Sequence, residues 1–250
     1  MSNDRRVALQ PAYILHRKPY RDTSLLLEIF SRDYGRIGLV ARGAQGKRST
    51  LKALLQPFQP LLLSWSGRGE LQTLTAAEAD GVPRPLVGEA LLSGFYLNEI
   101  LMRLLHRHDG HAELYSGYRR TLNTLSEGRE YDWPLRLFER DLLQELGYCL
   151  QLTHTADGEL LEASKCYCYH PEQGPVLAAT EQQDCLLVHG STLLSLDSGQ
   201  VDDIECRNEA KRLMRTVLQP YLGHRPLASR ELFRAQYAQS KNKITEYDKE

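Results

Sequence analysis

The sequence predicts an α+β protein in which a small β-barrel is followed by a mainly α-helical domain. Residues 1–80 contain five short apolar runs separated by turn residues, a pattern typical of a small closed or nearly closed barrel. Residues 81–85 (GVPRP) hold two prolines, which disfavour helix and strand alike and mark a domain boundary. From Leu86 onward the apolar residues recur with helical spacing.

The five predicted strands lie at residues 12–16, 23–31, 36–41, 60–65 and 71–76. Five strands are the minimal pattern of an OB barrel, although an SH3-like barrel would give a similar sequence, and the pattern alone favours the OB barrel only slightly. The candidates for the barrel interior are Tyr13, Leu15, Leu27, Ile29, Leu39 and Leu62.

The second domain is predicted to span residues 86–240. Apolar residues at helical spacing predict helices from Leu86 to about residue 105, at 112–125, at 133–147 and at 209–222, with a last short helix beginning at Ser229. Between the third and fourth helices, residues 148–205 form an irregular insert. In it we expect short strands at 165–170, 185–189 and 192–196 and a turn at 171–175.

Charge is distributed unevenly along the chain. The formal net charge is only −1, but residues 1–80 carry twelve lysines and arginines and seven acids, a net charge of +5. The remaining residues therefore carry a net charge of −6. A basic first third joined to an acidic remainder suggests one module that faces an anion and one module for other contacts.

The basic stretch at residues 41–58 (ARGAQGKRSTLKALLQPF) is the strongest binding candidate. It contains no acid, and its cations are Arg42, Lys47, Arg48 and Lys52. Gly43 and Gly46 interrupt regular structure, and the following apolar residues can anchor the loop to a core. Such a loop suits the phosphate backbone of a nucleic acid; the alternative is a solvated loop that only keeps the protein soluble.

Further cations and aromatic residues in the same domain extend this prediction. The additional cations near turns and strand ends are Arg17, Lys18, Arg21, Arg36 and Arg68. Aromatic residues that could stack on bases are Tyr20, Tyr34, Phe58 and Trp65. For these aromatic residues the alternative is ordinary packing in the core.

Several other classes of function are not favoured. No apolar run approaches the roughly 20 residues of a membrane-spanning helix, and the first residues lack the features of a secretory signal. Five cysteines, an odd number, fit free thiols in a reducing compartment better than a disulfide framework, so we expect a cytoplasmic protein without membrane partners. Neither a nucleophile elbow nor a Walker loop is present, so we expect neither an enzyme nor a cofactor.

The insert contains side chains able to bind zinc, namely His154, Cys166, Cys168, His170 and Cys185. Structural zinc sites usually contain C-x-x-C pairs, and this chain has none. We therefore expect no metal, with the cysteines acting as small apolar residues.

Specific motifs resemble the RecO family of bacterial DNA repair and recombination mediators. In the first domain these are DTSLL, GRIGLVARGA and STLKALLQPF, and further on they are GFYLNEILMRLL, PLRLFERDLLQELGY and KRLMRTVLQPYLGHRPLASRELF. The resemblance extends from about Ala8 to Phe233.

The resemblance implies an OB-fold domain followed by a helical domain, without enzymatic turnover. It implies binding of single- and double-stranded DNA and annealing of complementary strands. It also implies that the protein acts with RecR, and often RecF, to load RecA onto DNA coated by the single-stranded DNA-binding protein. Such proteins also recognise the acidic-apolar C-terminal tail of that coating protein. An arginine beside an apolar pocket would suit that tail, and Arg136 with Arg140 are the candidates.

Many members of that family carry a four-cysteine zinc site whose first pair follows an L-G-Y motif. Here Thr155 and Gly158 stand where that pair would be expected, which removes the zinc expectation. The resemblance also implies a protein associated with the nucleoid, and we expect a monomer. Two alternatives are an OB-fold RNA-binding protein and a protein-binding adaptor that does not bind DNA.

Overall fold

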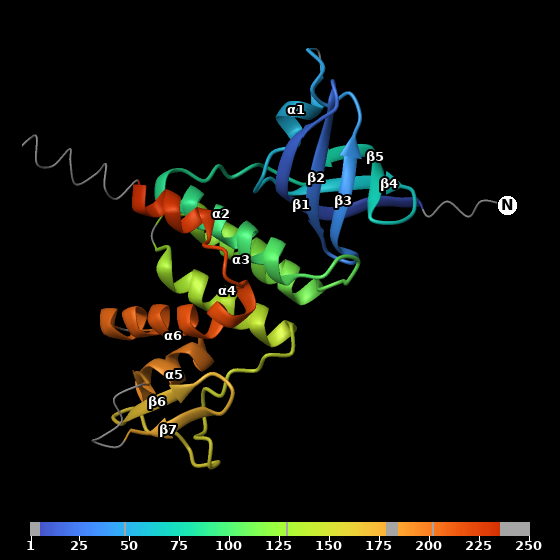
Figure 1. The fold of residues 1–250 in the computed structure, drawn as a ribbon. Coiled ribbons are helices and arrows are strands. Elements are labelled where there is room, and N and C mark those ends of the chain that lie inside the picture. The colour runs from blue at the N-terminus through green and yellow to red at the C-terminus, as the bar shows by residue number, and fades with distance from the viewer. Residues whose placement is uncertain (1–5, 48, 129, 179–184, 202, 236–250) are drawn as a thin grey trace, which may run out of the picture. The chain divides into compact units, whose positions relative to one another are not determined.

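The computed structural model describes residues 6–47, 49–128, 130–178, 185–201 and 203–235 (Figure 1). The chain forms two compact units. Unit 1 is Met1–Gly128 together with Arg225–Glu250, and unit 2 is Arg129–His224.

The barrel of unit 1 consists of β1 (Arg6–Tyr20), β2 (Ser24–Ser31), β3 (Gly35–Ala41), β4 (Leu61–Ser66) and β5 (Leu71–Ala79). These strands close in the order β1-β2-β3-β5-β4, with the long β1 pairing with both β2 and β4. All pairs are antiparallel except β3 with β5. A four-residue helix, α1 (Leu51–Leu54), lies in the connection from β3 to β4 (Figure 1). The predicted OB-like barrel and the α+β class are confirmed.

The barrel interior was only partly predicted. Leu27, Ile29 and Leu39 belong to the buried core cluster, as expected. Tyr13, Leu15 and Leu62 do not, because the adjacent residues Ala12, Ile14, Leu61 and Leu63 face the cluster, and successive side chains of a strand point to opposite faces. The cluster consists of Val7, Ala12, Ile14, Leu25, Leu27, Ile29, Ile37, Leu39, Ala41, Ala44, Leu55, Leu61, Leu63 and Trp65.

Two helices of unit 1 cover the outside of the barrel, α2 (Gly88–Leu104) and α3 (Ala112–Ser126). They explain why Tyr13 is buried although it faces outward, since its ring packs against the rings of Tyr115 and Tyr118. Asn98 of α2 donates a hydrogen bond to the carbonyl of Leu15 at 2.8 Å and accepts one from the hydroxyl of Tyr118. The joint between barrel and helices is therefore specified by polar groups as well as by packing.

A close backbone approach adds to this joint. Gly35 at the start of β3 has a φ of +63°, and a Cβ there would lie 1.6 Å from the carbonyl oxygen of Asp109 in the α2–α3 loop. Only glycine fits such a position. Residues 228–235 are helical and return to unit 1, where the carboxylate of Glu99 accepts from the amide and hydroxyl of Ser229 at 2.9 and 2.7 Å.

In its described residues, unit 2 contains three helices and a small sheet. The helices are α4 (Asp132–Glu145), α5 (Gly190–Ser198) and α6 (Ile204–Leu222). The sheet has the order β7-β6-β8, with β6 at Cys166–His170, β7 at Gly174–Leu177 and β8 at Leu186–His189.

One prediction within the insert is wrong, and another is correct only in part. Residues 192–196 were expected to form a strand but belong to helix α5, with Leu193 and Leu196 buried one turn apart. A short apolar run has too few residues to distinguish a strand from a buried helix. The expected turn at 171–175 extends into β7. Helix α6 also begins earlier than predicted, because the carboxylate of Asp203 caps it by accepting from two backbone amides.

The expectation that all cysteines are free is also wrong. A disulfide joins Cys168 of β6 to Cys185, whose Cα atoms are 5.6 Å apart. The pairing follows from the antiparallel alignment of β6 with β8, which places the residue before β8 beside β6. Cys149, Cys166 and Cys206 remain free thiols.

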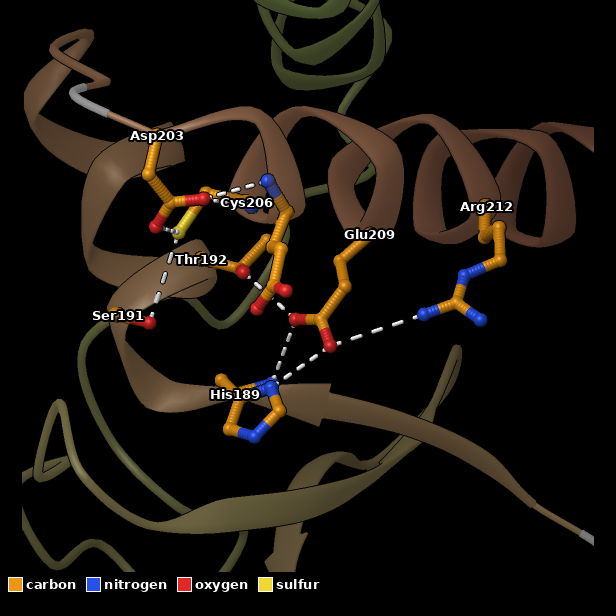
Figure 2. Close-up of polar contacts among 8 residues, drawn as sticks. His189, Ser191, Thr192, Asp203, Cys206, Glu209 and Arg212 are labelled. Atoms are coloured by element: carbon orange, nitrogen blue, oxygen red, sulfur yellow. Dashed lines mark hydrogen bonds and ion pairs between the residues drawn. The ribbon is translucent and has the colours of Figure 1, made fainter.

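One carboxylate links three elements of unit 2 (Figure 2). Glu209 of α6 accepts hydrogen bonds from the backbone amide and the Nδ1 of His189 at 3.0 and 2.7 Å, and from the hydroxyl of Thr192 at 2.7 Å. Burial alone would raise the pKa of Glu209, but these hydrogen bonds hold it below its ordinary value. The ionised carboxylate therefore fixes β8 and α5 to α6.

Candidate nucleic-acid interface

The basic loop after β3 and the turn between β1 and β2 meet at one end of the barrel. The amide of Gln45 donates to the carbonyl of Thr23 at 2.8 Å, and the Gln45 side chain donates to the carbonyl of Ser24 at 2.7 Å. Figure 1 shows α1 beside this end of the barrel. We call the exposed cations gathered here the basic end, and they are Lys18, Arg21, Arg42, Lys47 and Lys52.

The charge of the basic end is not neutralised. Within the described part of the chain, none of its five cationic side chains forms an ion pair. Arg21 lies over the ring of Tyr20, 5.2 Å from its centroid. Asp22, exposed in the same turn, is the neighbouring acid, so the six charged residues carry a net charge of +4. Unpaired, exposed cations retain their full attraction for an anion.

Arg17 and Arg36, also predicted to bind DNA, are engaged in structural contacts. Arg17 donates to the carbonyls of Lys52 and Leu55 at 3.3 and 3.0 Å, which fastens α1 to β1. The guanidinium of Arg36 is half-buried, pairs with Glu28 at 3.0 Å and donates to the carbonyls of Met102 and Leu105.

Glu28 also pairs with Arg107, so one carboxylate serves two arginines in the joint between barrel and α2. Arg68 is exposed in the β4–β5 loop, outside the basic end as defined above. Arg48 lies outside the described residues.

The predicted aromatic residues likewise divide into those that pack within the fold and one that lies at the basic end. Trp65 is 1% exposed in the barrel core, and Tyr34 packs edge-on against it. Phe58 packs edge-on against Phe95 of α2. Tyr20, half-exposed at the tip of β1, is the member of the predicted group that lies at the basic end.

The two arginines predicted to bind a partner's tail lie on α4 in unit 2. Arg136 is 6% exposed and pairs with the buried Glu139 at 2.7 Å. Arg140 donates to Asp141 and to the carbonyls of Leu196 and Asp197 at the end of α5. Both guanidinium groups thus already have partners within unit 2.

Sequence reasoning found the cations of the basic end but missed the residue that assembles it. Gln45 connects the loop to the turn through its backbone and its side chain. No pattern in the sequence distinguishes this glutamine from a solvated loop residue, because its partners lie about twenty residues earlier in the chain.

The geometry defines a class of protein: an OB-type barrel with an uncompensated cationic surface at one end. The comparisons with known proteins then identify the family. The family model described as "Recombination protein O N terminal" matches residues 6–81, and "Recombination protein O C terminal" matches residues 86–231. The chain belongs to the RecO family, a family of DNA repair and recombination proteins.

Curated relatives agree with this assignment along nearly the whole chain. The chain is 50% identical to "DNA repair protein RecO" of Methylococcus capsulatus over 231 residues, 92% of this chain and 94% of the relative. It is 46% identical to the protein of that name from Dechloromonas aromatica, over 92% of this chain and 96% of the relative. The corresponding protein of Nitrosococcus oceani is 50% identical over 91% of this chain and 93% of its own length.

Two further observations concern metals and membranes. Among the residues that the structure describes, no group of three or more His, Cys, Asp and Glu side chains is placed to hold a metal ion. None of the helices in the described ranges is long and apolar enough to cross a membrane.

Proposed function

We propose that this protein binds single- and double-stranded DNA through the basic end of its barrel. The observation that supports this most directly is the gathering of five exposed, unpaired cations at one end of an OB-type barrel in a member of a DNA repair family. Lysine and arginine bind phosphates without regard to sequence and release counterions from the DNA when they do so. Arg42, Lys47 and Lys52 are the central contacts among the described residues.

Annealing of complementary strands follows from the same chemistry. Two single strands repel one another through their phosphates, and a protein that neutralises part of that charge lowers the barrier to their encounter. The reaction needs no covalent step, so we propose that the protein acts without catalytic turnover. It supports recombination by helping RecR, and RecF where it participates, to load RecA onto DNA coated by the single-stranded DNA-binding protein.

Recognition of the coating protein's acidic-apolar tail is assigned to unit 2, with Arg136 and Arg140 as the candidate residues. A carboxylate reaches Arg136 only if the ion pair with Glu139 opens, because Arg136 is buried. Titration of a tail peptide against Arg136→Ala and Arg140→Ala tests the two residues separately. Unchanged affinity in either variant removes that residue from the site.

The test of DNA binding is fluorescence anisotropy of the intact protein with labelled single-stranded DNA, double-stranded DNA and structured RNA at several salt concentrations. We expect both DNA forms to bind with an affinity that falls steeply with salt. Preference for structured RNA over single-stranded DNA would favour an RNA-binding protein instead. No binding even at low salt would favour a protein-binding adaptor whose basic end has no DNA ligand.

A further inference from the structure

Unit 1 contains an open pocket on the surface next to the basic end. Its volume is about 310 Å³, at the lower end of the range of about 300–1,000 Å³ that is typical of ligand sites. Three segments form it: the residues just before β4, the proline-rich connection after β5, and the first turns of α2. Its lining residues are Gln56, Pro57, Phe58, Gln59, Pro83, Arg84, Pro85, Leu86, Leu91 and Phe95.

The lining combines flat apolar surfaces with a few polar groups. Phe95 is 37% exposed, a high value for a phenylalanine on a helix that packs against a barrel. Prolines and this ring provide the apolar walls, and Gln56 and Gln59 bring amide groups that both donate and accept. Arg84 is exposed, and among the described residues it has no hydrogen-bond or ion-pair partner. The lining contains no acid.

The backbone at Phe58 is held in an unusual conformation. Its φ is +66°, a left-handed value that side chains other than glycine rarely adopt. The ring packs over Gly94, where an added Cβ would lie 2.8 Å from Phe58 and 2.7 Å from Leu86. Gly94 thus makes room for the aromatic pair of Phe58 and Phe95. Residues held in such conformations by their surroundings are concentrated at binding sites.

The pocket is physically continuous with the basic end. The side-chain amide of Gln56 donates to the carbonyl of Lys52 at 2.6 Å, so one turn of chain separates the pocket wall from a cation of the basic end. Arg17 binds the carbonyls of Lys52 and Leu55 and fixes that turn to the barrel. A DNA backbone that lies on Lys52 therefore brings its bases close to the pocket.

We propose that this pocket holds an unpaired nucleobase of a single strand whose phosphates lie on the basic end. The inference rests on the DNA binding proposed above and adds a site that binds bases. The ring of Phe95 offers a stacking face, the two glutamine amides can bond to base edges of any sequence, and Arg84 meets a flanking phosphate. A duplex keeps its bases stacked and paired, so the pocket favours single strands.

The experiment compares two oligonucleotides of equal length, an oligothymidine and the same backbone without bases, binding to the intact protein. The wild-type protein is expected to bind the oligothymidine more tightly. Phe95→Ala is expected to reduce this preference about five- to 150-fold, the effect typical of losing one base–aromatic stack, and to leave the salt dependence unchanged. Val87→Ala, a change at an exposed residue immediately before α2 that does not line the pocket, is the matched control.

The outcomes distinguish the proposed base pocket from the proposed DNA binding by the basic end. Salt-dependent binding with the same base preference in the Phe95→Ala variant and the wild-type protein overturns the base pocket alone. Equal binding of the two oligonucleotides by the wild-type protein also overturns it. Failure of the wild-type protein to bind either oligonucleotide at low salt overturns both proposals. A second variant, Gln59→Ala, is expected to reduce the preference without removing the aromatic pair, which guards against a packing defect in Phe95→Ala.

Discussion

Removal of three cations from the basic end should weaken DNA binding by an amount that the geometry allows us to work out. The variant carries Arg42→Ala, Lys47→Ala and Lys52→Ala, all exposed and without ion pairs in the described part of the chain. If each cation meets one phosphate of a single strand, the slope of log K against log salt should fall by about 0.7 per contact, or about 2 in total. If the variant and the wild-type protein bind equally at about 1 M salt, this difference in slope makes the DNA affinity of the variant about 100-fold lower at about 0.1 M salt. That loss corresponds to about 2.8 kcal/mol of binding free energy.

The assay is fluorescence anisotropy of a labelled single strand between low and high salt. The matched control removes three exposed cations outside the barrel, Arg120, Lys165 and Arg215, so that the net charge changes equally. Both variants should melt close to the wild-type protein, since exposed substitutions usually change stability by less than about 0.5 kcal/mol. A triple variant with the wild-type salt slope, or a control with an equal loss, would refute DNA contact at the basic end.

Three predictions concern the stability of the scaffold. Glu28→Gln removes the shared charge from two partly buried arginines and should cost about 2 kcal/mol of unfolding free energy in a denaturant titration. Asn98→Ala removes a buried donor and acceptor and should also cost about 2 kcal/mol, whereas the exposed Asn123→Ala should cost little; equal effects would contradict the assigned contacts. Because the pKa of Glu209 is held below its ordinary value, its ionised form stabilises the fold above the unfolded pKa of about 4.3, and this contribution is lost as the pH falls further. The difference in melting temperature between the wild-type protein and Glu209→Gln should therefore shrink below about pH 4.3, and a constant difference would exclude this linkage.

The strand pattern and the turn residues were sufficient to predict the barrel, but not the side of each strand that faces inward. In β1 both faces are apolar, because Ile14 fills the interior while Tyr13 and Leu15 are covered from outside. Without alternation between apolar and polar residues, the sequence cannot set which face is inside. In the same way, the short run that became α5 has too few residues for its period to be recognised.

For the candidate site, too, the composition of the sequence predicted some features, whereas others depend on the geometry of the fold. The sequence identified where positive charge gathers, and Arg42, Lys47 and Lys52 are indeed exposed and unpaired among the described residues. It could not show that Arg36 is committed to Glu28 and to carbonyls of α2, or that Arg136 is buried beside Glu139. Those assignments depend on long-range packing. The pocket beside Phe95 likewise arises from three separate segments that only the fold brings together.

The most direct test of DNA annealing by the basic end is the annealing of complementary oligonucleotides, with and without the single-stranded DNA-binding protein. We predict that the wild-type protein accelerates annealing of both bare and coated strands. The triple variant at Arg42, Lys47 and Lys52 should lose most of this acceleration at about 0.1 M salt, while the charge-matched control keeps it. Annealing by the triple variant at the wild-type rate would contradict the proposed role of the basic end.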